Sequence, residues 1–317
     1  MNLHQFRFVQ EAARRNLNLT ETAKALHTSQ PGISKAILEL EEELGIDIFV
    51  RHGKRLKRIT EPGLRVLQAV DVILREVANL KRIGEEYSKQ DSGTLVIATT
   101  HTQARYLLPG PLVALRKRHP KVVVTLLEAA PPQVAQMLLD DRADVGLATE
   151  ALASTEGLLS LPCYEWQHML VMPADHPLAA VERLTLEQIA REPIVSYSTA
   201  YAGRSRIDQA FALKGLSPQI VLEATDADVI KTYVRHGMGL GIVPEITVKD
   251  DPACAPGGEL VVRPMGQFFG RNTTRIAFKR SAYLRSFVYA FAELVSERMN
   301  RGLIEKLMAG EAEHYEL

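Results

Sequence analysis

The sequence predicts a mixed α/β protein of three parts: an N-terminal winged helix-turn-helix unit, a long linker helix and a C-terminal α/β domain with two lobes. Three patterns lead to this prediction. Two short helices separated by a tight turn lie within residues 18–45, a basic segment with a glycine follows at residues 51–58, and short apolar strands alternate with helices from residue 93 onward. The predicted parts are residues 1–60, 61–92 and 93–317.

The composition is that of a globular protein with more than one domain. The chain has 317 residues, of which 46% are hydrophobic and 24% charged, and its formal net charge is zero. Cys163 and Cys254 lie far apart without metal-ligand spacing, which favours two reduced thiols. The N-terminus lacks the apolar run of a signal peptide, and no stretch of about 20 apolar residues is present to span a bilayer. We therefore expect a cytoplasmic protein.

The first 30 residues predict helices with well-marked beginnings. Asn2 is a good N-cap for a first helix, whose apolar face would be formed by Leu3, Phe6, Val9 and Ala13. Asn18 is expected to cap a second helix, with Glu21 completing a capping box. A break at His27 and Thr28 separates this helix from the next one, so the two form a helix-turn-helix pattern.

The third helix begins after Ser29, carries Pro31 in its first turn and ends at Gly45. Helical spacing predicts a core stripe of Ile33, Ile37, Leu40 and Leu44. Short polar groups and a cation project from the opposite face near its N-terminus, which suits a DNA major groove. The alternative is an ordinary helical hairpin with a solvated face. The residues predicted to contact DNA from this segment are Thr28, Ser29, Gln30, Pro31, Ser34 and Lys35.

The segment RHGKRLKR, residues 51–58, predicts a basic hairpin with Gly53 near its tip. Residues 1–60 contain ten Lys and Arg residues against seven Asp and Glu, and half of the basic residues fall in this segment without an acidic one. Such a wing beside a recognition helix suits phosphates or the minor groove. A solvated charge run is the alternative. We expect Arg51, Lys54 and Arg55 to hold the DNA backbone.

A long helix is predicted to begin at Thr60, Glu61 and Pro62 and to continue to about Gln90. Alternating spacings of four and three form a coiled-coil seam of Val66, Val70, Ile73, Val77, Leu80, Gly84 and Tyr87, which Leu67 and Leu74 widen. A lone helix would leave this stripe in water, so we expect it to pair with a second subunit. Dimerisation also fits DNA recognition, since two recognition helices read two half-sites.

The C-terminal part alternates strands and helices. The first lobe is expected to contain strands at residues 94–100, 122–127 and 144–149, with helices between them, in a βαβαβ order that favours a parallel sheet. The second lobe would begin with a strand at residues 168–173 and continue with strands at 193–196, 220–223 and 240–243. Helices are expected from Gly203 and from Asp226, and a strand at residues 274–279 and a long helix from Ala282 would close the chain.

Hydroxyl and amide side chains gather at predicted strand ends, at residues 99–103, 149–150 and 196–204. Ligands of open α/β sheets bind beyond the carboxyl ends of the strands. The first of these segments also leads into a helix, whose free N–H groups favour an anion. The sequence therefore predicts a small polar or anionic ligand between the two lobes. The alternative is that these threonines only cap helices.

Enzyme signatures are missing from the sequence. It contains no Gly-x-Ser-x-Gly, no His-Glu-x-x-His and no phosphate-binding loop ending in Gly-Lys-Ser/Thr. An enzyme acting on an acetylated amino acid would have only His101 and Glu150 as candidate catalytic groups. We expect Cys163 to be a buried structural thiol, and Tyr164 and Trp166 to be core residues.

The stretch from Thr22 to Arg55, TAKALHTSQPGISKAILELEEELGIDIFVRHGKR, resembles the signature of the LysR-type transcriptional regulators, and the order of the three parts resembles that family over essentially the whole chain. Four segments of the C-terminal domain look like the CysB subgroup, which regulates sulfur assimilation and cysteine biosynthesis: TTHTQARYLLP at 99–109, ATEAL at 148–152, LPCYEW at 161–166 and ATDADVIKTYV at 224–234. The resemblance implies a periplasmic-binding-protein-like C-terminal domain, a homotetramer built as a dimer of dimers, promoter DNA as partner and RNA polymerase as a further candidate partner. It implies neither an enzyme nor a cofactor or metal.

The resemblance also implies an effector such as N-acetylserine or O-acetylserine, with sulfate or thiosulfate able to occupy the same site. Carried over by matching motif, the effector-binding residues are Thr100, Thr102, Gln103, Thr149 and the position of Ala202. The subgroup has threonine at this last position, and residues 128–134 also depart from its pattern. These departures keep a regulator of organosulfur or other metabolism with a different small anion as the alternative. A solute-binding protein would share the two-lobed fold, but it would need a signal peptide and has no use for residues 1–60.

Overall fold

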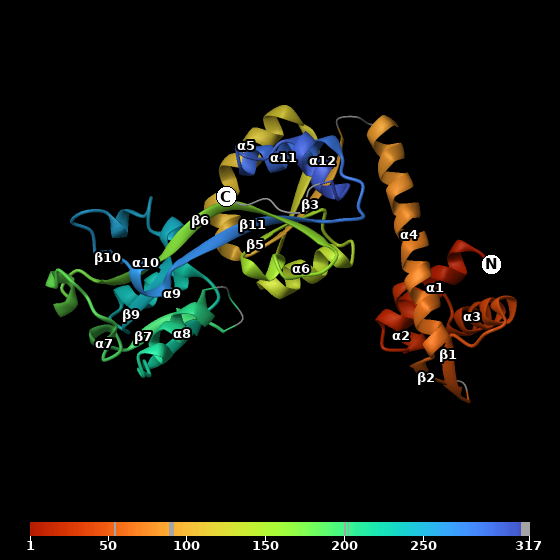
Figure 1. Cartoon of the computed structure of the whole chain (residues 1–317), viewed down its shortest axis with the longest axis horizontal. Helices are drawn as coiled ribbons and strands as arrows, with labels where there is room; N and C mark the ends of the chain where they lie inside the picture. Colours follow the sequence, from red (N-terminus) through yellow and green to blue (C-terminus); the bar gives the residue numbers. More distant parts are fainter. Residues whose placement is uncertain (54, 89–91, 200, 202, 312–317) are drawn as a thin grey trace. The chain divides into compact units, whose positions relative to one another are not determined.

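The computed structural model describes residues 1–53, 55–88, 92–199, 201 and 203–311 (Figure 1). The chain divides into two compact units, Met1–Glu85 and Glu86–Leu317. Lys54, Ala202 and the side chain of Glu150, which the sequence singles out, lie outside the described residues. Within the described part of the chain, no helix has both the length and the apolar character needed to cross a membrane.

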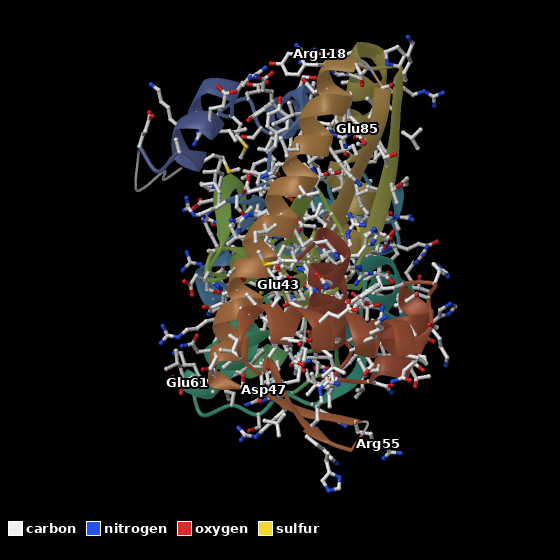
Figure 2. The ribbon with its side chains drawn as sticks, turned by 90° about the vertical axis from the view of Figure 1, so that its right-hand side faces the viewer. Glu43, Asp47, Arg55, Glu61, Glu85 and Arg118 are labelled. Carbon is white, nitrogen blue, oxygen red and sulfur yellow. The ribbon has the colours of Figure 1, made fainter. Side chains whose placement is uncertain are left out.

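The first unit is a helical cluster with a β-hairpin. Its elements are α1 (Leu3–Arg14), α2 (Leu19–Ala25), α3 (Gln30–Leu44), β1 (Phe49–His52), β2 (Arg55–Ile59) and most of α4 (Glu61–Ser88). β1 and β2 pair antiparallel, and Gly53 between them has a φ of 59°, a left-handed conformation that glycine adopts without strain. Figure 2 shows this hairpin projecting beyond the helices, with Arg55 on it. The predicted winged helix-turn-helix is therefore confirmed.

The helix ends follow the predicted capping residues. The side chains of Asn2, Asn18 and Ser29 accept backbone N–H groups at the starts of α1, α2 and α3. Gly45 ends α3 in the left-handed conformation, with a φ of 68°. The predicted capping box at Asn18 is wrong, because the carboxylate of Glu21 contacts the ammonium of Lys24 at 2.8 Å and the N–H of Asn18 donates to the carbonyl of Arg15 instead.

Two of the residues predicted to lie in the core of the first unit are exposed instead. Ile33, Ile37 and Leu40 of the α3 stripe are buried together with Phe6 and Val9 of α1. Leu3 and Leu44 are 40% and 37% exposed, because they are the first residue of α1 and the last of α3 and lie at the margin of the packed helices. A charged residue, Glu41, lies on the buried stripe instead and is only 5% exposed.

Helix α4 contributes to two different surfaces. The hydroxyl of Thr60 accepts the N–H of Gly63 at 2.9 Å and so caps the helix, as its sequence predicts. Leu67 and Val70, both assigned to the seam for a second subunit, pack into the core of the first unit, so the seam prediction is wrong for these two residues. Further along, a row of exposed apolar side chains with heptad spacing remains: Ile73, Leu80 and Tyr87. The predicted end near Gln90 lies outside the described residues.

The first lobe of the second unit is built on parallel strands. β3 (Ser92–Thr99), β4 (Lys121–Glu128) and β5 (Val145–Ala148) pair in the order β4-β3-β5, which confirms the predicted βαβαβ arrangement. A short π-helix, η1 (Gln103–Leu107), follows β3 and leads into α5 (Pro109–Arg118), and α6 (Pro131–Leu139) connects β4 to β5. A single turn of 3-10 helix, η2 (Glu150–Leu152), follows β5.

Two helices, α11 (Ser286–Val295) and α12 (Arg301–Met308), pack on the core of this lobe. The prediction of one long helix from Ala282 is therefore wrong. Ser296 adopts an extended conformation that ends α11, and the side chain of Asn300 accepts the N–H of Leu303 to begin α12. An N-cap asparagine starts a new helix because its side chain replaces a backbone carbonyl.

The second lobe has its own sheet and core. β7 (Ile194–Tyr197) pairs parallel with both β8 (Ile220–Ala224) and β9 (Leu240–Pro244). The helices of this lobe are α7 (Leu186–Ile189), α8 (Arg204–Leu213), α9 (Ala227–Arg235) and α10 (Gly266–Phe269), with short turns η3 (Pro177–Ala180), η4 (Glu245–Thr247) and η5 (Pro252–Cys254). β10 (Leu260–Pro264) pairs antiparallel with β6.

Two long antiparallel strands join the lobes. β6 (Leu158–Pro173) and β11 (Arg271–Lys279) pair along the length of β11, and Figure 1 shows them running side by side from one lobe into the other. β5 pairs with β11 in the first lobe, and β9 pairs with β6 in the second. The strand predicted at residues 168–173 is thus only the last part of β6, and the sequence did not indicate the part from Leu158 to Gln167, where Pro162 and several polar residues interrupt the apolar pattern.

Candidate functional site

The first candidate surface lies on α3 and the turn before it. Thr28, Ser29, Pro31 and Lys35 are exposed, and Gln30 and Ser34 are half-buried. Lys35 has Glu39 as a neighbour one turn on, at 3.7 Å. The N-terminal turn of α3 therefore presents hydroxyl, amide and ammonium groups to solvent, the groups that recognise base edges and phosphates.

The hairpin extends this surface. Arg55, Lys57 and Arg58 of β2 are exposed. A hollow of about 590 Å³ lies between the hairpin and the start of α2, and both Gln30 and Arg55 line it. The structure thus brings together a residue predicted to read bases and a residue predicted to hold phosphates, although 25 positions separate them in the chain. Lys54 lies outside the described residues.

Arg51 has a structural contact that the sequence did not indicate. Its guanidinium donates to the buried carboxylate of Glu41 at 2.9 Å, and its other amino group lies 3.5 Å from the hydroxyl of Ser34. The same carboxylate accepts the backbone N–H groups of Ile48 and Phe49 at 2.9 and 3.0 Å. Glu41 therefore ties the hairpin to the recognition helix. Its helical spacing from Ile33 and Ile37 was the available signal for its burial.

The second candidate site lies in the second unit, at the carboxyl ends of β3 and β5. Thr100, Thr102, Gln103 and Thr149 are each less than 9% exposed. All four side chains are neutral and can donate hydrogen bonds. The hydroxyl of Thr102 lies 3.3 Å from that of Tyr197 at the end of β7, so the cluster includes groups from both lobes. Burial raises the pKa of Tyr197, which keeps its phenol protonated.

Unpaired polar atoms accompany this cluster. Among the described residues, the buried hydroxyl oxygens of Thr149 and Ser196 have no hydrogen-bond partner. A buried hydroxyl without a partner loses the hydrogen bonds that it would make with water, so such groups are rare unless a ligand or water completes them. The hydroxyls of Thr149 and Ser196 are therefore available for a further hydrogen bond.

Gly203, the residue before α8, lies close to β6. Gly203 has a φ of 90°, and a Cβ atom there would lie 2.4 Å from Nε2 of His168, so a side chain cannot be accommodated without movement. Burial, together with the charge of Arg206, lowers the pKa of His168 to about 4, so this imidazole is neutral. Ala202, the fifth position assigned to the effector, lies outside the described residues.

The candidate catalytic and reactive groups have structural contacts. His101 contacts Glu128 at 2.8 Å. It lies with Asp226 and Asp228 in a group whose ligand-type atoms are within 4.8 Å of one another, but Asp226 caps α9 and Asp228 contacts Arg105 at 2.7 Å. The thiol of Cys163 is buried as predicted, and burial raises its pKa to about 12. A thiol with such a pKa is unreactive at neutral pH.

Both units match models of known protein families. Residues 3–64 match the bacterial regulatory helix-turn-helix proteins of the lysR family, and residues 88–300 match the LysR substrate binding domain. Together these matches cover most of the chain, and they include the surface of α3 and the hairpin as well as the cluster at the ends of β3 and β5.

Similar proteins of known name are regulators. The HTH-type transcriptional regulator CysB of Burkholderia cenocepacia is 56% identical over 317 residues, which is 100% of both chains. The regulator SsuR of the same organism is 47% identical over 97% of this chain and 99% of its own. The regulator cbl of Escherichia coli is 45% identical over 93% of this chain and 92% of its own.

Solved structures agree with the fold. The cofactor-binding domain of the Cbl transcriptional regulator matches with a TM-score of 0.64 and 40% identity, over 70% of this chain and 95% of that one. A full-length OxyR variant from Pseudomonas aeruginosa matches with a TM-score of 0.66 over 93% of this chain and 97% of its own, and at 21% identity it supports the fold alone.

Proposed function

The chain belongs to the LysR family of bacterial transcriptional regulators, and we propose that it controls sulfur-assimilation genes in response to a small effector bound in its second unit. The effector class that we propose is an acetylated serine, or a sulfur oxyanion such as sulfate or thiosulfate. The observation that carries this proposal is the buried cluster of neutral donors at the ends of β3 and β5, with the unpaired hydroxyl of Thr149 within it. The full-length similarity to CysB supports the assignment of the regulated genes to sulfur assimilation.

DNA recognition is proposed to use the N-terminal turn of α3 and the hairpin. Gln30, Ser34 and Lys35 would reach base edges or adjacent phosphates, with Thr28, Ser29 and Pro31 beside them, and Arg55 would contact the backbone. The exposure of these groups and the hollow shared by Gln30 and Arg55 support this assignment. Arg51 would act differently from Arg55, because its guanidinium is paired with Glu41 and keeps only part of its donors for DNA.

We expect Arg55→Ala to weaken binding to all DNA sequences to a similar extent. A phosphate contact releases counterions, so its loss should reduce the slope of log K against log salt by about 0.9 for each subunit bound to the DNA. The slope would be measured by fluorescence anisotropy with a duplex that the wild-type protein selects from a random pool and with a scrambled duplex of the same length. Gln30→Ala should behave differently, losing about 1–3 kcal/mol on the selected duplex only.

Lys214→Ala is the matched control for Arg55→Ala. Lys214 is an exposed cation at the end of α8 in the second unit. Its replacement by alanine changes the net charge by the same amount and alters no residue of the first unit. An unchanged affinity and salt slope in Arg55→Ala, equal to those of Lys214→Ala, would contradict the assignment of the hairpin to phosphates.

The effector proposal rests on the chemistry of the donors. Thr100, Thr102, Gln103 and Thr149 can each donate a hydrogen bond, and none of them carries a charge. Buried neutral donors favour a ligand rich in acceptor oxygens, such as an oxyanion or a carboxylate. Each ligand oxygen then accepts a hydrogen bond that the donor would otherwise make with water. Acetylserines and sulfur oxyanions are both rich in acceptor oxygens, so we propose the same binding site for both.

We expect Thr149→Val to weaken effector binding without destabilising the protein. Valine has nearly the shape of threonine but lacks the hydroxyl, and a hydrogen bond to a charged ligand contributes about 1.5–3 kcal/mol. This corresponds to a loss of roughly ten- to a hundredfold in affinity. Calorimetry of the full chain with sulfate, thiosulfate, N-acetylserine and O-acetylserine would measure the loss.

Removal of an unpaired buried hydroxyl should leave the thermal midpoint of the free protein unchanged or raised. Thr125→Val is the control, because Thr125 is an exposed residue on β4 and the substitution is the same. Binding of a ligand to wild type and Thr149→Val with the same affinity would place the effector elsewhere. Binding of organosulfur compounds in preference to all four probes would favour the alternative effector class.

A further inference from the structure

Three polar side chains beside the proposed effector site form a ring of contacts that includes two hydrogen bonds. The hydroxyl of Tyr164 donates to Oε1 of Gln103 at 2.8 Å, and Nε2 of Gln103 donates to the hydroxyl of Thr274 at 3.3 Å. Thr274 contacts Tyr164 in turn and offsets part of the rise that burial causes in the pKa of its phenol. Tyr164 on β6 and Thr274 on β11 face each other directly in the register of the two strands that join the lobes.

The ring leaves one donor of Gln103 unused. A glutamine amide has one oxygen and two N–H groups. Tyr164 holds the oxygen and Thr274 accepts one N–H, so the second N–H has no partner within the ring. Gln103 is only 3% exposed, and a buried N–H without a partner is costly. The natural partner of this group is an acceptor atom of a bound ligand.

A second unused donor lies nearby. Arg275 of β11 pairs antiparallel with Ala148, the last residue of β5, so the next residue, Thr149, leaves the strand at the end where Thr274 precedes Arg275. The hydroxyl of Thr149 is buried and unpaired. Gln103, which donates to Thr274, and Thr149 therefore offer two donors near the Thr274 hydroxyl that the ring already uses.

We propose that Tyr164 is a positioning residue that determines which oxyanions the protein binds. This inference rests on the proposed effector site. By holding Oε1 of Gln103, Tyr164 makes the amide an obligate donor toward the ligand. A fully deprotonated oxyanion such as sulfate can only accept hydrogen bonds, so it pairs with donors of the protein. Phosphate at neutral pH carries at least one P–OH group, which needs an acceptor, and the fixed amide offers none, so the protein binds phosphate less tightly than sulfate.

The test is the ratio of phosphate to sulfate dissociation constants in Tyr164→Phe. Without the phenol hydroxyl, the Gln103 amide can rotate and present its oxygen to a P–OH group. Sulfate should bind about tenfold more weakly and the ratio should fall by about tenfold or more, since one hydrogen bond to a charged ligand is lost and one acceptor gained. Calorimetry of the full chain at pH 7 with sodium sulfate and sodium phosphate would measure both constants.

Thr274→Val is the matched variant, since it also removes one buried hydroxyl of the ring but leaves the bond between Tyr164 and Gln103. It should keep the wild-type ratio, whatever its effect on affinity. A ratio that is unchanged in Tyr164→Phe, or changed equally in both variants, would overturn the proposal, and so would a Tyr164→Phe protein that unfolds, because the hydroxyl would then be needed for the fold. A wild-type protein that binds neither anion would instead contradict the proposed effector class and its site.

Discussion

Glu41→Ala is expected to disrupt the DNA-binding unit and abolish DNA binding while leaving the second unit folded. The buried carboxylate accepts two backbone N–H groups of the turn into β1 and the guanidinium of Arg51. Its removal leaves these donors without their partner in a buried place: the side chain of Glu41 is 5% exposed and that of Arg51 is 20% exposed. Breaking a fully buried pair costs about 3–5 kcal/mol, and we expect roughly 2–4 kcal/mol here because Arg51 retains contact with water.

Such a loss is a large part of the stability of a small unit. Calorimetric scans of the full chain should show a transition of the first unit at lower temperature, with the transition of the second unit unchanged. Glu42→Ala is the control, because Glu42 is the next residue on α3 and is exposed. Glu41→Gln should lie between the two, since its amide oxygen can still accept the backbone N–H groups while the charge pairing with Arg51 is lost. Equal melting and DNA affinity in Glu41→Ala and Glu42→Ala would show that the hairpin does not depend on this carboxylate.

Leu80→Asp is expected to break the subunit contact made by α4 and, with it, high-affinity DNA binding. Leu80 is 68% exposed within one chain and lies between Ile73 and Tyr87, each seven residues away. Two-fold symmetry would place the new carboxylate in the apolar contact twice, at a cost of several kcal/mol. The first unit itself should remain folded, because Leu80 does not belong to its core. Val77 is a less suitable position, since it is half-buried within its own chain.

Light scattering of the full-length protein should show a smaller assembly than the wild type. Affinity for a duplex with two half-sites should fall towards that for a single half-site, because the recognition helices are no longer linked through α4. Leu213→Asp is the control, since Leu213 on α8 is 80% exposed and the change in charge and apolar area is the same. A Leu80→Asp protein that keeps the wild-type assembly and DNA affinity would rule out the row on α4 as the contact between subunits.

The features of this protein that follow from the sequence alone depend on residues close together in the chain. Asn2, Asn18, Ser29 and Gly45 mark the helix ends because a cap involves only the next three or four residues. The βαβαβ order of the first lobe follows from the alternation of apolar strands and amphipathic helices. A polar region at residues 99–103 and 149–150 could be predicted because the ends of parallel strands meet at one edge of a sheet. The choice of Thr100, Thr102, Gln103 and Thr149 within it came from the family resemblance.

The tertiary structure decided what depends on contacts between distant segments. Leu67 and Val70 fit a coiled-coil seam, but the first unit offers them an apolar core, and burial there does not require a second subunit. The length of β6 could not be predicted, because Pro162 and the polar residues around it do not form the apolar pattern of a strand. This part of β6 is stabilised by its pairing with β11, which lies about 100 residues later in the chain. Glu41 is buried on an apolar stripe only because the turn into β1 and Arg51 supply donors for its carboxylate. Tyr164 had the sequence pattern of a core residue. Its contact with Gln103 exists because strand register places Thr274 opposite it, and because Gln103, at the start of η1, hydrogen-bonds to both. A hydrogen bond of this kind depends on a few tenths of an ångström between segments far apart in the chain, and a local sequence pattern carries no information about that distance.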